Sequence, residues 1–125
     1  MPVRSLLSPV LKWPDVETVV AALRHWAARI AGRCPDVLRV GYFGSYARGD
    51  WGVGSDLDIV IIVQDTTTPF ERRAAAWDTT SLPVPAELLV YTADEWHRLA
   101  EGSSMARAMR REVHWVWGKE EGAGP

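Results

Sequence analysis

The stretch of sequence that decides the fold is "VGYFGSYARGDWGVGSDLDIVIIV", residues 40–63. It opens with a short apolar run, passes through a glycine-rich segment and closes with a longer apolar run. Such runs, bounded by turn residues, predict strands over Val37–Phe43 and Leu57–Val63. The second run is apolar without alternation, which predicts a strand buried on both faces.

A long helix is predicted on the N-terminal side of this stretch. Apolar residues recur at helical spacing across Asp15–Arg33. Pro14 and Asp15 suit the start of a helix, and Gly32 and Pro35 mark its end.

Two capping-box patterns predict helices on the C-terminal side. Thr68–Glu71, with proline at the first helical position, predicts a helix to about residue 78. Thr92–Glu95 predicts a second helix to about residue 101, directly after a predicted strand over Ala86–Tyr91. Residues 105–117 fit both a helical and a strand period, and we expect a helix followed by a short strand.

The element order predicts an α/β (α+β) fold in which helices flank a small mixed central sheet. A chain of 125 residues, 47% hydrophobic and 24% charged, has the size and composition of a single domain. We therefore expect one domain over residues 1–125, with Gly118–Pro125 as a disordered tail.

Composition excludes several classes of protein. The formal net charge of −2 excludes general nucleic-acid binding through bulk charge. The longest apolar run, Ile59–Val63, is too short to span a bilayer, and Met1–Trp13 lacks the pattern of a secretory signal. We therefore expect a cytoplasmic protein with no membrane partner. Cys34 is the single cysteine, so no internal disulfide can form.

The chain has seven tryptophans, many for a core of this size. Some of them could face a partner protein, because large amphipathic side chains are enriched at interfaces. Alternatively, they cover the edge of the core. Both interpretations stay open at this point.

Asp56 and Asp58 form the strongest candidate site. Residues two apart in a strand point to the same face, so the two carboxylates are expected to project together. Two adjacent anions repel unless a cation lies between them. Carboxylate oxygens select Mg²⁺ or Mn²⁺, and no histidine or cysteine lies nearby in the sequence. The alternative is a pair of solvated aspartates at the end of a strand.

Gly44 and Ser45 follow the first strand directly, and Tyr46–Arg48 could form a short helix. Backbone N–H groups at such a turn suit a phosphate, glycine permits close approach, and the serine hydroxyl adds a donor. A plain turn is the alternative.

The spacing Gly-Ser, ten residues, then Asp-x-Asp resembles the signature of the minimal, MNT-type nucleotidyltransferases of the DNA polymerase beta-like superfamily. Gly44, Ser45, Asp56 and Asp58 match this signature without a gap. The resemblance implies the nucleotidyltransferase fold, known as the polymerase beta-like palm. It also implies Mg²⁺ (or Mn²⁺) as cofactor, ATP as substrate and a phosphate clamp by Arg48. For Arg48, a surface ion pair with Asp50 is the alternative.

The family carries a third carboxylate on a following strand, and "VPAELLVYT" (residues 84–92) has Glu87 at the matching position in place of the usual aspartate. Glutamate keeps the charge and adds one methylene, so it could still bind metal or accept a proton. The resemblance thus implies Asp56, Asp58 and Glu87 as catalytic and metal-binding residues. An exposed residue at the start of the strand is the alternative for Glu87.

The resemblance implies transfer of AMP from ATP to a hydroxyl acceptor. It further implies that this acceptor is a tyrosine of a HEPN-type helical toxin, which this chain would neutralise as an antitoxin. The alternative is a catalytically weak nucleotide- or partner-binding module that neutralises its partner by contact, which the change at Glu87 favours. Antibiotic modification is less favoured because no second domain is present to hold such a substrate. Association with copies of itself or with a partner stays open.

The remaining polar candidates have ordinary explanations. His25, His97 and His114 lie far apart in the sequence without metal-ligand spacing. Residues 107–111 carry three arginines, which predict a solvated helix face, with an acidic partner as the alternative.

Overall fold

A mixed four-stranded sheet forms the centre of the protein, whose computed structural model describes residues 13–119. The strand order is β3-β2-β1-β4. The strands are β1 (Val37–Phe43), β2 (Leu57–Val63), β3 (Ala86–Thr92) and β4 (His114–Gly118). β2 runs antiparallel to β1 and parallel to β3, and β4 pairs antiparallel with β1. The predicted bounds of β1 and β2 are confirmed, and β3 is one residue longer than predicted.

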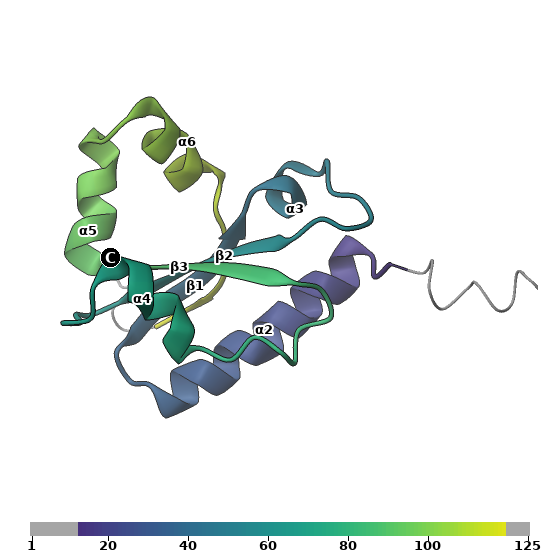
Figure 1. Ribbon diagram of the computed structural model, residues 1–125, viewed down its shortest axis with the longest axis horizontal. Coiled ribbons are helices and arrows are strands. Elements are labelled where there is room, and N and C mark those ends of the chain that lie inside the picture. The colour runs from purple at the N-terminus through teal and green to yellow at the C-terminus, as the bar shows by residue number, and fades with distance from the viewer. Residues whose placement is uncertain (1–12, 120–125) are drawn as a thin grey trace, which may run out of the picture.

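Helices cover both faces of the sheet. α2 (Val16–Arg33) lies on one face, and α5 (Ala93–Arg98) and α6 (Ser104–Glu112) lie on the other (Figure 1). Two shorter helices, α3 (Ser45–Arg48) and α4 (Phe70–Arg73), connect strands. The predicted class, a mixed sheet flanked by helices, is confirmed.

β2 is buried on both faces, as its unbroken apolar run predicts. Alternate side chains, such as Ile59 and Ile61, join the core under α2, while Val60 and Ile62 pack with Trp96 of α5 on the other face. Each fully buried aliphatic side chain contributes about 1.5–3 kcal/mol. Strong burial on two sides makes β2 a rigid support for the residues at its N-terminal end.

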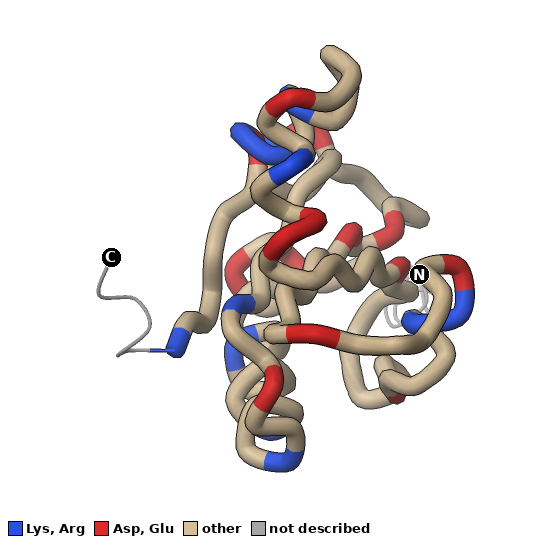
Figure 2. The backbone as a smooth tube through the Cα atoms, turned by 90° about the vertical axis from the view of Figure 1, so that its left-hand side faces the viewer, with Lys and Arg blue, Asp and Glu red and all other residues tan. Residues whose placement is uncertain are grey.

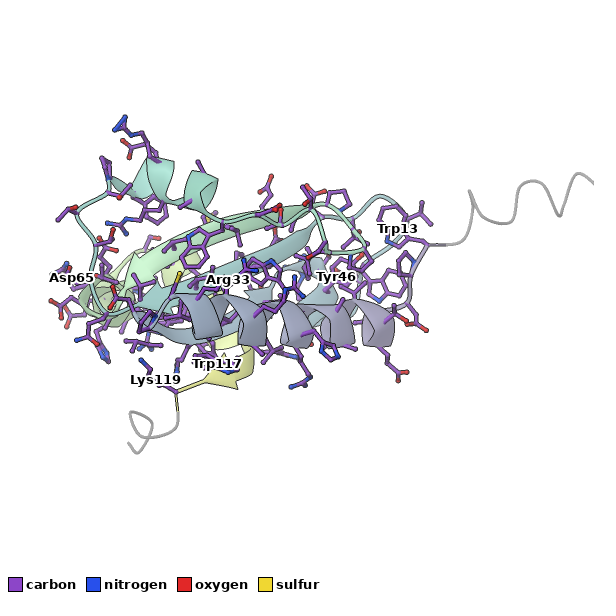
Figure 3. The ribbon with its side chains drawn as sticks, turned by 90° about the horizontal axis from the view of Figure 1, so that it is seen from below. Trp13, Arg33, Tyr46, Asp65, Trp117 and Lys119 are labelled. Atoms are coloured by element: carbon purple, nitrogen blue, oxygen red, sulfur yellow. The ribbon has the colours of Figure 1, made fainter. Side chains whose placement is uncertain are left out.

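α2 runs the length of the sheet, from the end marked by Trp13 and Tyr46 to the end marked by Asp65 and Lys119 (Figure 3). Its N-cap is Asp15, whose carboxylate accepts a hydrogen bond of 2.8 Å from the Thr18 amide. These hydrogen bonds to Thr18 lower the pKa of Asp15. The predicted start and end of this helix are confirmed.

The tryptophans belong to the cores. Trp26 and Trp96 are buried, and the other five are partly buried and pack against one of the two cores: Trp13, Trp51, Trp77, Trp115 and Trp117. The structure therefore favours the core-edge interpretation. The number of tryptophans gives no independent support for a partner interface.

The predicted capping box at Thr68 is wrong. The N-cap of α4 is Pro69, no side chain caps it, and the Thr68 carbonyl instead accepts a hydrogen bond from Arg73. The helix ends at Arg73 and continues as a 3-10 turn over Ala74–Ala76, short of residue 78. The chain leaves the helix early because Trp77 packs against the core under α2 and the Asp78 carbonyl accepts a hydrogen bond from the Trp26 indole.

The second predicted capping box is confirmed. The Thr92 side chain accepts from the Glu95 amide, and the Glu95 carboxylate accepts from the Thr92 amide. α5 itself ends at Arg98, and a 3-10 turn over Leu99–Glu101 completes the predicted span. α6 and β4 confirm the predicted helix followed by a short strand.

Arg73 links α4 to this capping box. Its side chain is buried, its guanidinium donates to both Glu95 carboxylate oxygens at 2.6 and 3.1 Å, and it also donates to the Val90 carbonyl. The hydrogen bond from Arg73 is the main reason that the pKa of Glu95 is lowered. The pair therefore stabilises the fold at neutral pH, and this contribution is lost as pH falls through the lowered pKa.

We expect Arg73→Met to lower the free energy of unfolding by about 3 kcal/mol at pH 7, because it leaves a partly buried carboxylate unpaired. Urea titration measures this loss. Arg72→Met is the matched control, since Arg72 is exposed, and it should change stability by less than about 0.5 kcal/mol. Equal losses in the two variants would contradict the assigned role of Arg73.

The expected disordered tail does not include Gly118 or Lys119. Gly118 belongs to β4, and the Lys119 amide donates to the Leu38 carbonyl at 2.9 Å. Residues 120–125 lie outside the described part of the chain. Within residues 13–119, no helix is both long and apolar enough to cross a membrane. Acidic and basic positions are interspersed along the chain (Figure 2).

Candidate functional site

Gly44, between β1 and α3, has a backbone conformation that only glycine adopts readily. Its φ of +78° and ψ of −151° fall outside the regions open to L-residues with a side chain. A Cβ on Gly44 would also overlap the Asp58 carboxylate oxygen Oδ2. Glycine therefore brings the backbone of this turn directly against the Asp58 carboxylate, a contact that the sequence did not predict.

Asp58 and Glu87 are neighbours across the sheet. Asp58 pairs with Phe43 of β1 on one side and with Glu87 of β3 on the other. Adjacent strands lie about 4.8 Å apart, and residues in register share a face. The structure thus brings Glu87 beside Asp58, on the face of the sheet that carries α5 and α6.

Asp56 lies just outside β2, which begins at Leu57, and it is exposed. β2 begins at Leu57 as predicted, so the strand alternation from which both carboxylates were expected to project together does not extend to Asp56. The Leu57 amide donates to the Pro85 carbonyl, so the backbone turns toward β3 before the strand begins. The negative charge of Asp56 is still close enough to raise the pKa of Asp58.

The pKa of Asp58 is raised. Burial is the main cause, followed by the negative charges of Glu87 and Asp56, and the nearby positive charge of Arg48 opposes the change. The folded protein therefore holds ionised Asp58 at an energetic cost. A cation bound among these carboxylates would offset that cost.

Arg48 lies at the end of α3 and pairs with two carboxylates. Its Nε donates to Asp50 at 3.2 Å, and its Nη1 donates to Glu112 of α6 at 3.2 Å. Both contacts raise the pKa of Arg48, so the guanidinium stays charged. The ion pair with Asp50 that was the alternative for Arg48 is present, and half of the side chain is still exposed to solvent.

Glu112 is the residue of the site that the sequence analysis missed. Its Oε1 accepts a hydrogen bond of 2.9 Å from the Gly44 amide, and its Oε2 accepts from Arg48. Sixty-eight residues separate Glu112 from Gly44, and Glu112 belongs to no recognisable motif. No pattern in the sequence indicates this contact, which forms because the end of α6 lies beside the turn that follows β1.

A cavity of about 560 Å³ opens between the sheet and α6. Gly44, Arg48 and Asp58 line its polar part, and Leu89, Tyr91 and Met109 are among the residues of its apolar part. This volume is within the range of small-molecule sites. The cavity can thus accept a ligand that has a charged end and an apolar end.

The donor atoms suit a hard divalent cation, because carboxylate oxygens are the preferred ligands of Mg²⁺. The raised pKa of Asp58 is a second observation in favour of a cation here. As the side chains lie in residues 13–119, however, no group of three or more histidine, cysteine, aspartate or glutamate residues is arranged to hold a metal ion. Carboxylate is thus the right type of ligand, and a rearrangement of side chains would be needed to form a three-ligand group.

An aromatic stack supports the glycine-rich loop. Trp51 stacks on Tyr46 of α3 with ring centroids 5.5 Å apart and planes 8° apart. The Trp13 indole donates to the Tyr46 hydroxyl at 3.0 Å. Tyr46 is buried, so α3 and its Gly44 turn are anchored to the core under α2.

The other polar candidates have structural explanations in this part of the chain. His25 and His97 are exposed, and the Nδ1 of His114 lies 3.2 Å from the Tyr42 hydroxyl. Arg107 and Arg110 donate to backbone carbonyls of Gly102 and Trp96. The arginines of α6 therefore support the solvated-face interpretation more than an acidic partner.

Comparisons with known proteins agree with this geometry. Residues 24–102 match the family model described as a nucleotidyltransferase domain. A candidate nucleotidyltransferase of Sulfolobus solfataricus has the same fold, with a TM-score of 0.64 and 19% identity over 85% of this chain and 86% of that chain. Weaker similarity extends to a toxin–antitoxin structure with AMP-PNP (TM-score 0.48, 18% identity, 79% of this chain and 76% of that chain). It extends also to a mutant of the toxin–antitoxin MntA–HpeT (TM-score 0.47, 16% identity, 79% and 75%). No curated protein matches the sequence significantly.

Proposed function

Because the chain belongs to the nucleotidyltransferase domain family, we propose that it transfers a nucleoside monophosphate, AMP from ATP, to a hydroxyl acceptor. The observation that carries this proposal is the convergence of Asp58, Glu87 and the Gly44 turn at one end of the sheet. Gly44, Arg48 and Asp58 line a single cavity there, and the exposed Glu87 lies beside Asp58 on the neighbouring strand.

The residues have distinct roles in this proposal. The Gly44 amide, the Ser45 hydroxyl and the Arg48 guanidinium bind the triphosphate. Asp56, Asp58 and Glu87 would hold Mg²⁺ (or Mn²⁺), which neutralises charge on the phosphates as the bond to pyrophosphate breaks. Glu87 accepts the proton of the attacking hydroxyl. The apolar part of the cavity holds the nucleoside against Leu89 and Tyr91.

Glu87 is the residue whose role the sequence leaves most open. We expect Glu87→Gln to lower the transfer rate by about a hundredfold, the usual contribution of a general base. Glu87→Asp should retain more activity, because it keeps a carboxylate on the same strand position. Single-turnover rates measure both variants, at concentrations of ATP and Mg²⁺ that saturate each variant. Full activity of Glu87→Gln would exclude Glu87 as the base.

The acceptor is proposed from the resemblance to antitoxins of the minimal family: a tyrosine of a HEPN-type helical partner. The test is to incubate the protein with ATP, Mg²⁺ and such a partner and to measure the intact mass of the partner. A gain of one nucleoside monophosphate, mapped to a tyrosine, is the expected result. A modified small hydroxyl compound, with the partner unchanged, would contradict this choice of acceptor.

A second candidate is a binding module that neutralises a partner by contact alone. The observation that favours it is that the acids of residues 13–119 form no three-residue metal group as they lie. Loss of partner activity without any change in its mass is the result that this candidate predicts. The same mass measurement therefore separates the two.

A further inference from the structure

The Glu112 carboxylate occupies the place where the proposed function requires a phosphate. One of its oxygens accepts from the Gly44 amide at 2.9 Å and the other from the Arg48 guanidinium at 3.2 Å. A phosphate group would use two oxygens on the same two donors, because carboxylate and phosphate share this bidentate geometry. The Gly44 amide has a single hydrogen, so it cannot donate fully to Glu112 and to a phosphate at once.

Glu112 is also unfavourably located for a purely structural residue. Its side chain is only 24% exposed and lines the cavity beside Asp58. Its negative charge is one of those that raise the pKa of Asp58. The Glu112 carboxylate thus adds a further negative charge to an already acidic site. The hydrogen bonds that it accepts from Gly44 and Arg48 offset this repulsion.

α6 can release this carboxylate at small cost. No residue of the helix is buried, and Met105 in its first turn is 79% exposed. Glu112 is the last residue of α6, and extended backbone follows at Val113. Segments with few buried contacts open most easily, and the Glu112 side chain needs only a new rotamer to leave Gly44.

We propose that Glu112 is a built-in competitor for the nucleotide: its carboxylate closes the phosphate position formed by Gly44 and Arg48 and must leave before a triphosphate binds. This inference rests on the proposed function, in which the same two donors hold phosphate. Glu112 thereby sets the affinity for nucleotide, and a partner that draws α6 away from the sheet would raise that affinity.

The test compares four proteins in calorimetric titrations with inorganic triphosphate and with ATP, both with Mg²⁺. Glu112→Gln removes the charge of the competitor at nearly constant shape. Glu112→Asp keeps the charge but is too short to reach both donors. Glu101→Gln is the control, because it makes the same change of net charge at an exposed position outside the cavity lining.

We expect Glu112→Gln to lower the Kd for triphosphate by about tenfold, because the protein no longer has to displace its own carboxylate before the phosphates bind. Glu112→Asp should also bind more tightly than wild type, and Glu101→Gln should bind like wild type. Tighter binding in Glu112→Gln alone would overturn the inference in favour of a simple charge effect. Weaker binding would overturn it in favour of Glu112 as a residue that positions Gly44.

The two proposals fail in different ways. If wild type and both Glu112 variants bind triphosphate equally, the inference fails and the proposed function stands. If none of the four folded proteins binds triphosphate or ATP, the proposed function fails and the inference fails with it. Circular dichroism spectra identical to wild type establish that each variant is folded.

Discussion

Replacing Asp58 with asparagine is expected to abolish nucleotidyl transfer and, at the same time, to make the folded protein more stable. Asp58 is the acid most centrally located, between Gly44 and Glu87. Loss of its charge should lower the transfer rate by about a thousandfold or more, as for other preorganised groups that stabilise a charged transition state. A single-turnover assay measures the rate.

The gain in stability follows from the raised pKa of Asp58. A carboxyl whose folded pKa lies above its unfolded pKa binds its proton more tightly when folded, so stability falls as pH rises between the two values. Asparagine removes this cost, and we expect the free energy of unfolding at pH 7 to rise by about 1 kcal/mol, typical of stabilising changes at functional sites. The free energy of unfolding of the variant should also lack the part of its pH dependence that titration of Asp58 causes in the wild type.

Asp36→Asn is the matched control for both effects. Asp36 is exposed and directly precedes β1, at the end of that strand opposite to Gly44. Its replacement should leave the transfer rate and the stability within error of wild type. A destabilised Asp58→Asn variant would mean that the carboxylate is a structural acceptor and not a strained functional group.

Gly44→Ala is expected to be strongly destabilising. The new Cβ would meet Asp58 Oδ2, and the backbone conformation, with φ of +78°, is one that alanine adopts only under strain. Together these effects should lower the free energy of unfolding by about 3 kcal/mol. Phosphate binding should fail as well, because relief of the clash separates the Gly44 amide from the site.

Two other glycines of the same loop distinguish the effect of backbone strain from the effect of steric overlap by an added Cβ. Gly49 has φ of +87° but open space around a Cβ, so Gly49→Ala should cost about 1 kcal/mol. Gly52 has neither a positive φ nor a neighbour within 4 Å, so Gly52→Ala should be nearly neutral. Urea titrations of the three variants should follow this order, and equal losses would contradict the close approach at Gly44.

Much of this site could be predicted from sequence because its parts follow local rules. The apolar runs gave the bounds of β1 and β2, and the order of the strands brought Glu87 beside Asp58. The shared direction of Asp56 and Asp58 was inferred from strand alternation, which does not reach Asp56 because β2 begins at Leu57.

The errors have a common physical cause, which is contact between residues distant in sequence. Thr68 has the local pattern of an N-cap, yet its carbonyl accepts a hydrogen bond from Arg73. The Arg73 guanidinium also donates to the Glu95 carboxylate. Glu112 has no local pattern at all, and it meets Gly44 only because the end of α6 lies beside the turn that follows β1. Propensity and spacing describe one segment at a time, so neither could reveal these pairs.

The proposed reaction transfers a nucleotidyl group, which is the α-phosphate together with its nucleoside. The position of the label that reaches the acceptor tests this directly. The protein is incubated with Mg²⁺, acceptor and ATP labelled either at the α-phosphate or at the γ-phosphate. We expect α-label to become covalently bound to the acceptor and γ-label to leave in pyrophosphate, and we expect neither result with Asp58→Asn. Transfer of γ-label, or transfer that persists in Asp58→Asn, would contradict the proposed reaction.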